Sequence, residues 1–164
     1  MRSLTLVTVV CAFMVTSAAA QAPDPQLIAP IQKFIDSFNK GDTAGAMATH
    51  AAGADLVIID EVPPFIWRGT KAFQAWSAAL DSASKQAGIT DQMVTISAPT
   101  RIESGGDSGY VIVPAVYTYK EKGVAMREAA QMTFALKKGA SGWLIHGWTW
   151  TGPKPQRAAA SPKQ

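Results

Sequence analysis

The chain has 164 residues, of which 15 are Lys or Arg, 12 are Asp or Glu, two are His and one is Cys. The small positive excess and the scatter of the basic residues give no reason to expect a nucleic-acid partner. One cysteine excludes an intramolecular disulfide, and two well-separated histidines without clustered carboxylates make a dedicated metal site unexpected.

The first twenty residues have the three parts of a secretory signal peptide. Arg2 follows the initiating methionine, residues 4–15 carry no charge, and residues 18–20 are the small alanines of a cleavage site. The apolar run is too short to cross a bilayer as a helix, so we expect cleavage after residue 20 and no membrane contact afterwards. The mature protein, periplasmic or secreted, would then lack Cys11 and its thiol. Because export also removes it from cytosolic nucleotide cofactors, we expect no cofactor.

Three helices are predicted in the first half of the mature chain. The first ends at Gly41, begins between residues 25 and 30, and has an apolar face at helical spacing. Its members are Ile31, Phe34, Ile35 and Phe38. Asp42 caps a short second helix that reaches His50, which is expected at the surface. A third helix follows Gly69-Thr70, presents one apolar stripe from residue 73 to 87, and stops at Gly88.

The remaining pattern predicts strands. A buried strand is expected at residues 56–61, and four long strands follow the third helix at 93–103, 110–120, 125–138 and 142–151, separated by hairpin turns. Helices first and strands later predict an α+β domain, with the helices packed on one face of a curved antiparallel sheet. We place this domain at residues 21–152 and expect the tail at 153–164 to be disordered.

Four segments occur in the order and spacing typical of one family. They are residues 34–42, 67–73, 131–138 and the closing Gly-Trp-Leu-Ile-His of 142–146. In these segments the chain resembles the nuclear transport factor 2-like superfamily, particularly its SnoaL-like members. The resemblance implies a cone, in which a bent sheet wraps around a long helix and leaves a pocket at the open end. Such proteins include isomerases, cyclases, dehydratases, epoxide hydrolases and modules that only bind a ligand or dimerise, so the fold does not decide the function.

Two departures from the family pattern narrow the chemistry. This chain has Gln131 where many relatives have Arg, which argues against an anionic ligand at that position. It has Gly-Trp-Thr-Trp at residues 147–150 where many relatives have a further His or Ser, so a common acid/base position is missing.

Asp60 and Tyr117 are candidate catalytic residues. Asp60 shares a strand face with Leu56 and Ile58, and a carboxylate beside apolar residues can become a general base, as the Asp base of ketosteroid isomerase does. A phenol from Tyr117 or Tyr119 could then stabilise an oxyanion. The alternative is that Asp60 and its neighbour simply end a strand before a Pro-Pro turn.

His146 is the third candidate catalytic residue. In a regular strand it would share a face with Leu144, Trp148 and Trp150, where burial could tune it into a proton carrier. The alternative is a histidine at a sheet or dimer surface, satisfied by one hydrogen bond.

Five side chains are candidates for holding a ligand, namely Trp67, Tyr119, Gln131, Thr133 and Trp148. The two tryptophans could be aromatic walls of a pocket or plain core. Gln131 and Thr133 lie on the polar face of their strand, opposite Met132 and Phe134, and that face meets either solvent or a partly wet pocket.

Three functions stay open, in this order. The first is an exported module that binds a small, largely apolar molecule in the cone. The second is a cofactor-free isomerase, hydrolase or dehydratase with Asp60 or His146 as base and a tyrosine as donor. The third is an interaction domain that forms a homodimer through its sheet and has no ligand.

Overall fold

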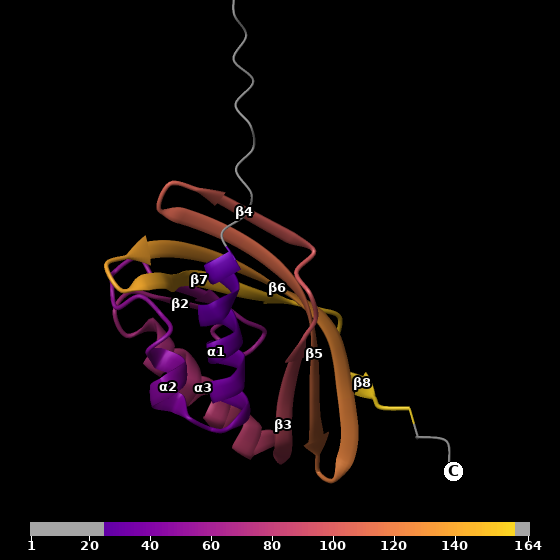
Figure 1. The fold of residues 1–164 in the computed structure, drawn as a ribbon. Helices are drawn as coiled ribbons and strands as arrows, with labels where there is room; N and C mark the ends of the chain where they lie inside the picture. The colour runs from indigo at the N-terminus through magenta and orange to yellow at the C-terminus, as the bar shows by residue number, and fades with distance from the viewer. Residues whose placement is uncertain (1–24, 160–164) are drawn as a thin grey trace, which may run out of the picture.

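The computed structural model describes residues 25–159. The predicted signal peptide and the last residues of the tail lie outside this range. Within it, no helix is long and apolar enough to cross a membrane. Three helices lie against the concave side of a curved, unclosed sheet (Figure 1), so the predicted α+β architecture is confirmed.

The helices form where the apolar spacing predicted them. A short 3-10 turn, η1 (Pro25–Leu27), leads into α1 (Ile28–Asn39), followed by α2 (Thr43–Met47) and α3 (Ala72–Ala87). Pro30 is tolerated because it lies in the first turn of α1, where a backbone N–H has no partner within the helix. Asp42 caps α2 by accepting a hydrogen bond from the Gly45 backbone N–H at 2.8 Å.

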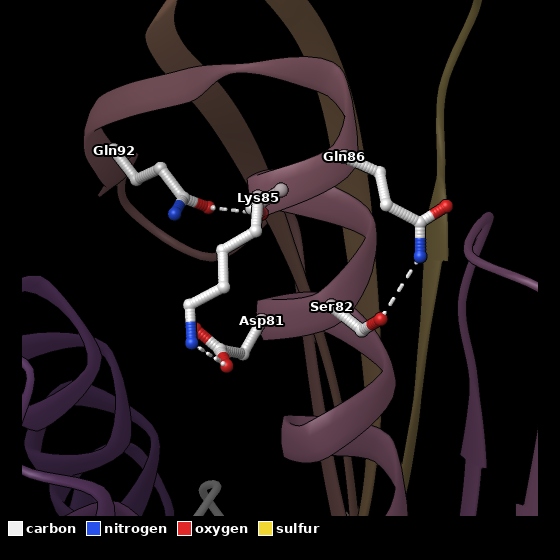
Figure 2. Close-up of polar contacts among 6 residues, drawn as sticks. Asp81, Ser82, Lys85, Gln86 and Gln92 are labelled. Carbon is white, nitrogen blue, oxygen red and sulfur yellow. Dashed lines mark hydrogen bonds and ion pairs between the residues drawn. The ribbon is translucent and has the colours of Figure 1, made fainter.

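The outer side of α3 is stabilised only by local contacts (Figure 2). Lys85 Nζ pairs with Asp81 at 2.6 Å, and Gln86 Nε2 donates to Ser82 Oγ at 3.0 Å. Such exposed pairs contribute little, about 0.2–0.5 kcal/mol each. Gly88 ends the helix in the left-handed conformation, with φ of 70°, as its position in the sequence predicted.

Eight strands make up the sheet. They are β1 (Val57–Ile59), β2 (Ile66–Arg68), β3 (Ile89–Ile96), β4 (Arg101–Gly105), β5 (Ser108–Glu121), β6 (Val124–Gly139), β7 (Gly142–Thr151) and β8 (Gln156–Arg157). The order is β2-β1-β7-β6-β5-β3, with β4 paired to β5 and β8 to β6. The sheet is not purely antiparallel, because β1 runs parallel to β7. That pairing brings the start of the domain against its last long strand.

Two segments differ from the sequence prediction. The strand expected at 93–103 is split: β3 pairs with the second half of β5 and β4 with the first half. Pro99 lies between them, where it can donate no ladder hydrogen bond and restricts the residue before it. Within the tail that we expected to be disordered, Gln156–Arg157 forms β8 on the edge of β6.

A bulge in β7 overturns the face predicted for His146. Ala135 pairs with Gly147 and Leu136 with Ile145, so His146 is an extra residue without a partner position on β6. The alternation of inward and outward side chains along β7 shifts by one at this bulge. Ile145 and Trp148 therefore both face the core although they are three residues apart. Gly147 is required by the close approach of β1, since a Cβ there would lie 2.9 Å from the Val57 carbonyl oxygen.

The core between sheet and helices is largely aromatic. Phe34 of α1 is 2% exposed, and its ring lies 5.7 Å from Trp148 and 4.9 Å from His50. Phe73 and Trp76 of α3 complete this group. His50 is therefore buried, not at the surface as its place after a helix suggested. We call these five residues the aromatic core.

Candidate functional site

One cleft enters the inner side of the sheet beside the loop that follows β1. The cavity has a volume of about 60 Å³, smaller than that of a typical small-molecule site, and it opens to solvent at its mouth. Its apolar walls come from α1, the loop after β1, α3, β3 and β7, and its polar groups from that same loop and β5. The lining residues are Phe38, Asp60, Glu61, Val62, Leu80, Val94, Tyr117 and Trp150. We call it the acidic cleft.

Asp60 is held rigidly in this cleft. Its Oδ2 accepts a hydrogen bond from Trp76 Nε1 at 2.6 Å, and its Oδ1 accepts one from the Glu61 backbone N–H at 2.7 Å. Burial raises the pKa of Asp60, and the two hydrogen bonds oppose that rise. Because both oxygens already have donors, Asp60 is better placed to fix Trp76 and the loop than to accept a further proton.

Glu61 and Glu128 are neighbouring carboxyl groups. Glu128 lies on β6 opposite Tyr117 and is 1% exposed. Its Oε1 accepts a hydrogen bond from Trp150 Nε1 at 2.7 Å, whereas its Oε2 receives none. Glu61 comes close to Glu128 from the loop after β1, and the negative charge of Glu128 disfavours ionisation of Glu61.

The pKa of Glu61 is the most unusual in the cleft. Burial, the negative charge of Glu128, the hydrogen bond to it and the charge of Asp60 together raise this pKa to about 7. Much of the Glu61 side chain is nevertheless exposed, so it exchanges protons with solvent. A carboxyl group that titrates near neutral pH can both accept and return a proton under physiological conditions.

Tyr117 supplies the phenol of the cleft. Its hydroxyl donates to Gln92 Oε1 at 2.5 Å, and Figure 2 shows the Gln92 side chain directed toward α3. The Tyr117 ring stacks on Tyr119 at 4.7 Å and meets Trp150 edge-on at 6.2 Å. Burial raises the pKa of both tyrosines, with nearby acidic groups adding to it, so both stay neutral hydrogen-bonding groups at physiological pH.

The structure therefore brings two of the three catalytic candidates together. Asp60 and Tyr117 line the same cleft, while His146 lies at the bulge of β7 and does not line it. Tyr119, a ligand-binding candidate, lies behind Tyr117 and contacts its ring.

The other four ligand-binding candidates do not line the acidic cleft. Trp67 and Trp148 are 7% and 3% exposed and belong to the core. Gln131 is exposed and Thr133 half-buried on the face of β6 opposite Met132 and Phe134, away from the helices. The polar row on this strand therefore belongs to the convex side of the sheet.

Two residues of the site were missed in the sequence. Glu61 was considered only as the end of a strand, and Glu128 was not considered at all. A signal existed for Glu128, because it has the same strand parity as Met132 and Phe134, which form the apolar face. A charge on a buried face is an exception that calls for a function or a partner.

The histidine in the aromatic core has a different environment. Trp148 Nε1 donates to His50 Nε2 at 3.1 Å, so the neutral ring carries its proton on Nδ1 and donates to the Ala46 carbonyl oxygen at 3.0 Å. Burial lowers the pKa of His50 to about 4, and the bond to Ala46 opposes this only partly. Across residues 25–159, no three His, Cys, Asp or Glu side chains are arranged to hold a metal ion.

Comparisons with known proteins find relatives in structure but not in sequence. No family model and no curated protein matches the chain. Among solved structures, a nuclear transport factor 2-like superfamily protein from Salmonella enterica serovar Typhimurium superposes with a TM-score of 0.65 at 15% identity, over 78% of this chain and 89% of that one. A ketosteroid isomerase-like protein from Erwinia carotovora atroseptica superposes with a TM-score of 0.60 at 21% identity, over 79% of this chain and 95% of that one.

A protein of unknown function with a cystatin-like fold from Nostoc punctiforme gives a TM-score of 0.57 at 16% identity, over 79% of this chain and 90% of that one. At such identities the likeness concerns the fold alone. This chain has the cone fold of the nuclear transport factor 2-like proteins, as the resemblance in sequence implied.

Proposed function

We propose that this protein is exported and binds a small, largely apolar molecule in the acidic cleft. The observation that supports this most is the composition of its lining, five apolar side chains around three polar ones. Pockets for small molecules are commonly built in this way, with apolar walls that supply affinity and a few polar groups that fix orientation.

Native mass spectrometry of protein purified from its own compartment tests this function. We expect a non-covalently bound molecule, and a mature N-terminus at Gln21 if the signal peptide is cleaved. A Leu80→Trp variant should lose the bound molecule because the new side chain fills the cleft. Ser82→Trp on the exposed side of the same helix is the matched control and should retain it. A cleft that is empty in every preparation would contradict the proposal.

A second candidate is a cofactor-free enzyme that moves a proton next to a carbonyl group. One observation favours it: Glu61, with a pKa of about 7, and the neutral phenol of Tyr117 line one cleft. The carboxylate would take the proton, and the Tyr117 hydroxyl, after leaving Gln92, would donate to the oxygen on which charge develops. This assigns the base to Glu61, where the sequence suggested Asp60.

Exchange of the α-protons of cyclohexanone in D₂O, followed by NMR, tests this candidate. We expect the wild type to accelerate exchange, Glu61→Gln to lose at least about tenfold, and Tyr117→Phe to lose a similar factor. Glu103→Gln, which removes an exposed carboxylate on β4, is the control. If Glu61→Gln exchanges the protons as fast as the wild type, this assignment is wrong.

The convex side of the sheet is our proposal for a homodimer contact. Half-buried Ile112, Pro114 and Val116 of β5 are on this side, next to the small and polar outer residues of β6. The middle of this face, around these three residues, carries no charge on β5 or β6, and the basic residues Lys120, Arg127 and Lys137 lie toward its ends; such an uncharged centre suits self-association.

A further inference from the structure

We propose that the acidic cleft selects small apolar molecules that carry a protonated amine, with the ammonium group bound by Glu61 and its charge balanced by Glu61 and Glu128 together. This inference rests on the proposed binding function and names the chemical class of its ligand.

The charges around the cleft have one sign. Asp60 and Glu61 line it, the charge of Glu128 acts on Glu61 from nearby, and no Lys, Arg or His is among the lining residues. The nearby cations Lys85 and Lys120 are paired with aspartates at the protein surface. A carboxylate ligand would therefore be repelled, whereas a cation would be attracted.

The hydrogen bonds around the cleft leave one buried carboxyl oxygen without a donor, that of Glu128 next to Glu61. Both oxygens of Asp60 have donors, and so has Glu128 Oε1. Glu128 Oε2 receives no hydrogen bond although Glu128 is 1% exposed, and an unsatisfied buried acceptor of this kind costs about 1–3 kcal/mol. At low pH Glu61 is protonated and can act as the missing donor to this oxygen, which reduces that cost. At higher pH the two carboxylates need a donor that also carries positive charge, and an ammonium group is both.

The walls suit the rest of such a molecule. Trp150, Tyr117 and Phe38 present aromatic surface, which attracts a cation over its face and a hydrocarbon along its edge. Val94 and Leu80 complete an apolar surface for the carbon skeleton. Ca²⁺ and Mg²⁺ prefer six or more oxygen ligands, including water, and the apolar side chains of Val94 and Leu80 add none. An alcohol could donate a hydrogen bond but would leave the charge of the carboxyl pair unbalanced.

Binding of an ammonium group to Glu61 should depend on pH, because the ammonium group competes with the proton of Glu61. The titratable groups that face Glu61 are Asp60 in the same loop, Glu128 from β6, and Tyr117 and Tyr119 from β5. Both tyrosines stay neutral between pH 6 and pH 8, so only the carboxyl groups change their protonation in this range. Because the pKa of Glu61 is about 7, a bound ammonium displaces a proton below this pH and competes with none above it. Affinity for an amine should rise between pH 6 and pH 8, and affinity for an uncharged analogue should not.

Isothermal titration calorimetry with benzylamine, benzyl alcohol and benzoate tests the selectivity on one hydrocarbon. At pH 8 we expect benzylamine to bind the wild type at least ten times more tightly than benzyl alcohol, and benzoate to bind least. At pH 6 benzylamine should weaken about tenfold, since about one Glu61 in ten is then ionised. The heat measured in buffers of different ionisation enthalpy should report proton release on binding at pH 6 only.

Three variants sharpen the test, each checked for an unchanged circular-dichroism spectrum. Glu61→Gln should reduce the preference for amine over alcohol to less than about twofold. Glu128→Gln should shift the pH dependence to lower pH, because the pKa of Glu61 falls when the charge of Glu128 is removed while its burial remains. Glu103→Gln, an exposed carboxylate on β4, should behave as the wild type.

The outcomes separate this inference from the proposed function. If benzyl alcohol binds but benzylamine binds no better, the amine selectivity is wrong and the apolar binding function stands. Tightest binding of benzoate, or displacement of benzylamine by millimolar Ca²⁺, would also overturn it. If none of the three probes binds, both proposals fail.

Discussion

Two tryptophans on one face of β7 hold two buried ionisable groups in opposite ways. Trp148 Nε1 donates to His50, whose other ring nitrogen is also bonded, so the aromatic core contains no unmatched polar atom around it. Trp150 Nε1 donates to Glu128, whose second oxygen is left without a donor. The same kind of donor thus completes a core in one place and leaves one buried carboxyl oxygen without a donor in the other. The comparison shows that counting partners atom by atom separates a structural polar group from one available for chemistry.

The largest expected difference between the two regions is in packing energy. Phe34→Ala, in the aromatic core, should lower the free energy of unfolding by about 3–5 kcal/mol, because it removes a fully buried ring. Leu80→Ala, in the wall of the half-open acidic cleft, should cost roughly 1 kcal/mol. Urea denaturation of both variants measures this. Equal losses would mean that the cleft is part of the core.

The pH dependence of stability should have opposite signs in the two regions. The folded pKa of His50 is about 4, below its unfolded value of 6.5, so the unfolded state binds more protons between these values. Its contribution lowers stability as pH falls from 6.5 to 4, by up to about 3 kcal/mol. His50→Gln should flatten the unfolding free energy in this window.

Glu61 contributes in the other direction. Its folded pKa of about 7 lies above the unfolded value of 4.5, so its contribution to stability is present below pH 4.5 and lost as pH rises through 7. Subtracting the unfolding free energies of Glu61→Gln from those of the wild type at each pH isolates this contribution. A difference that does not vary with pH would show that the pKa of Glu61 is not raised in the folded state.

The smallest effect is expected for Glu128→Gln. The amide keeps an acceptor for Trp150 Nε1 and removes the buried charge, so at pH 8 the variant should equal the wild type or exceed it by about 1 kcal/mol. Thermal unfolding at pH 8 measures the change. A large loss of stability would show that the charge of Glu128 is structural, and would weaken its assignment to ligand binding.

The sequence predicted the fold better than it predicted the site. Spacing of apolar residues and the positions of Gly41 and Gly88 determine the helices locally, so all three were found. The long hairpins follow from period-two alternation in the same way. The sequence did not predict that the strand is split at Pro99 or that β1 runs parallel to β7. Both features depend on which distant segment of the chain pairs with each strand.

The site shows the same limit more strongly. Asp60 and Tyr117 were predicted to act together and do share the acidic cleft, although 57 positions apart in the chain. His146 was assigned to the wrong face because a bulge cannot be seen in alternation alone. Glu128 could have been found from its parity on β6, but its partner Glu61 comes from a loop whose path depends on tertiary contacts.

The bulge in β7 also has a consequence for how the chain tolerates length changes. His146 shifts the phase of the strand by one, which makes Trp148 and Trp150 continue on the same side as Trp143 and Ile145. Deleting this one residue would remove the bulge and leave Trp148 two positions after Ile145, so both indoles would stay on the inner face beside His50 and Glu128. The bulge therefore accommodates one extra residue in β7 without changing the side of the sheet on which the two indole donors lie.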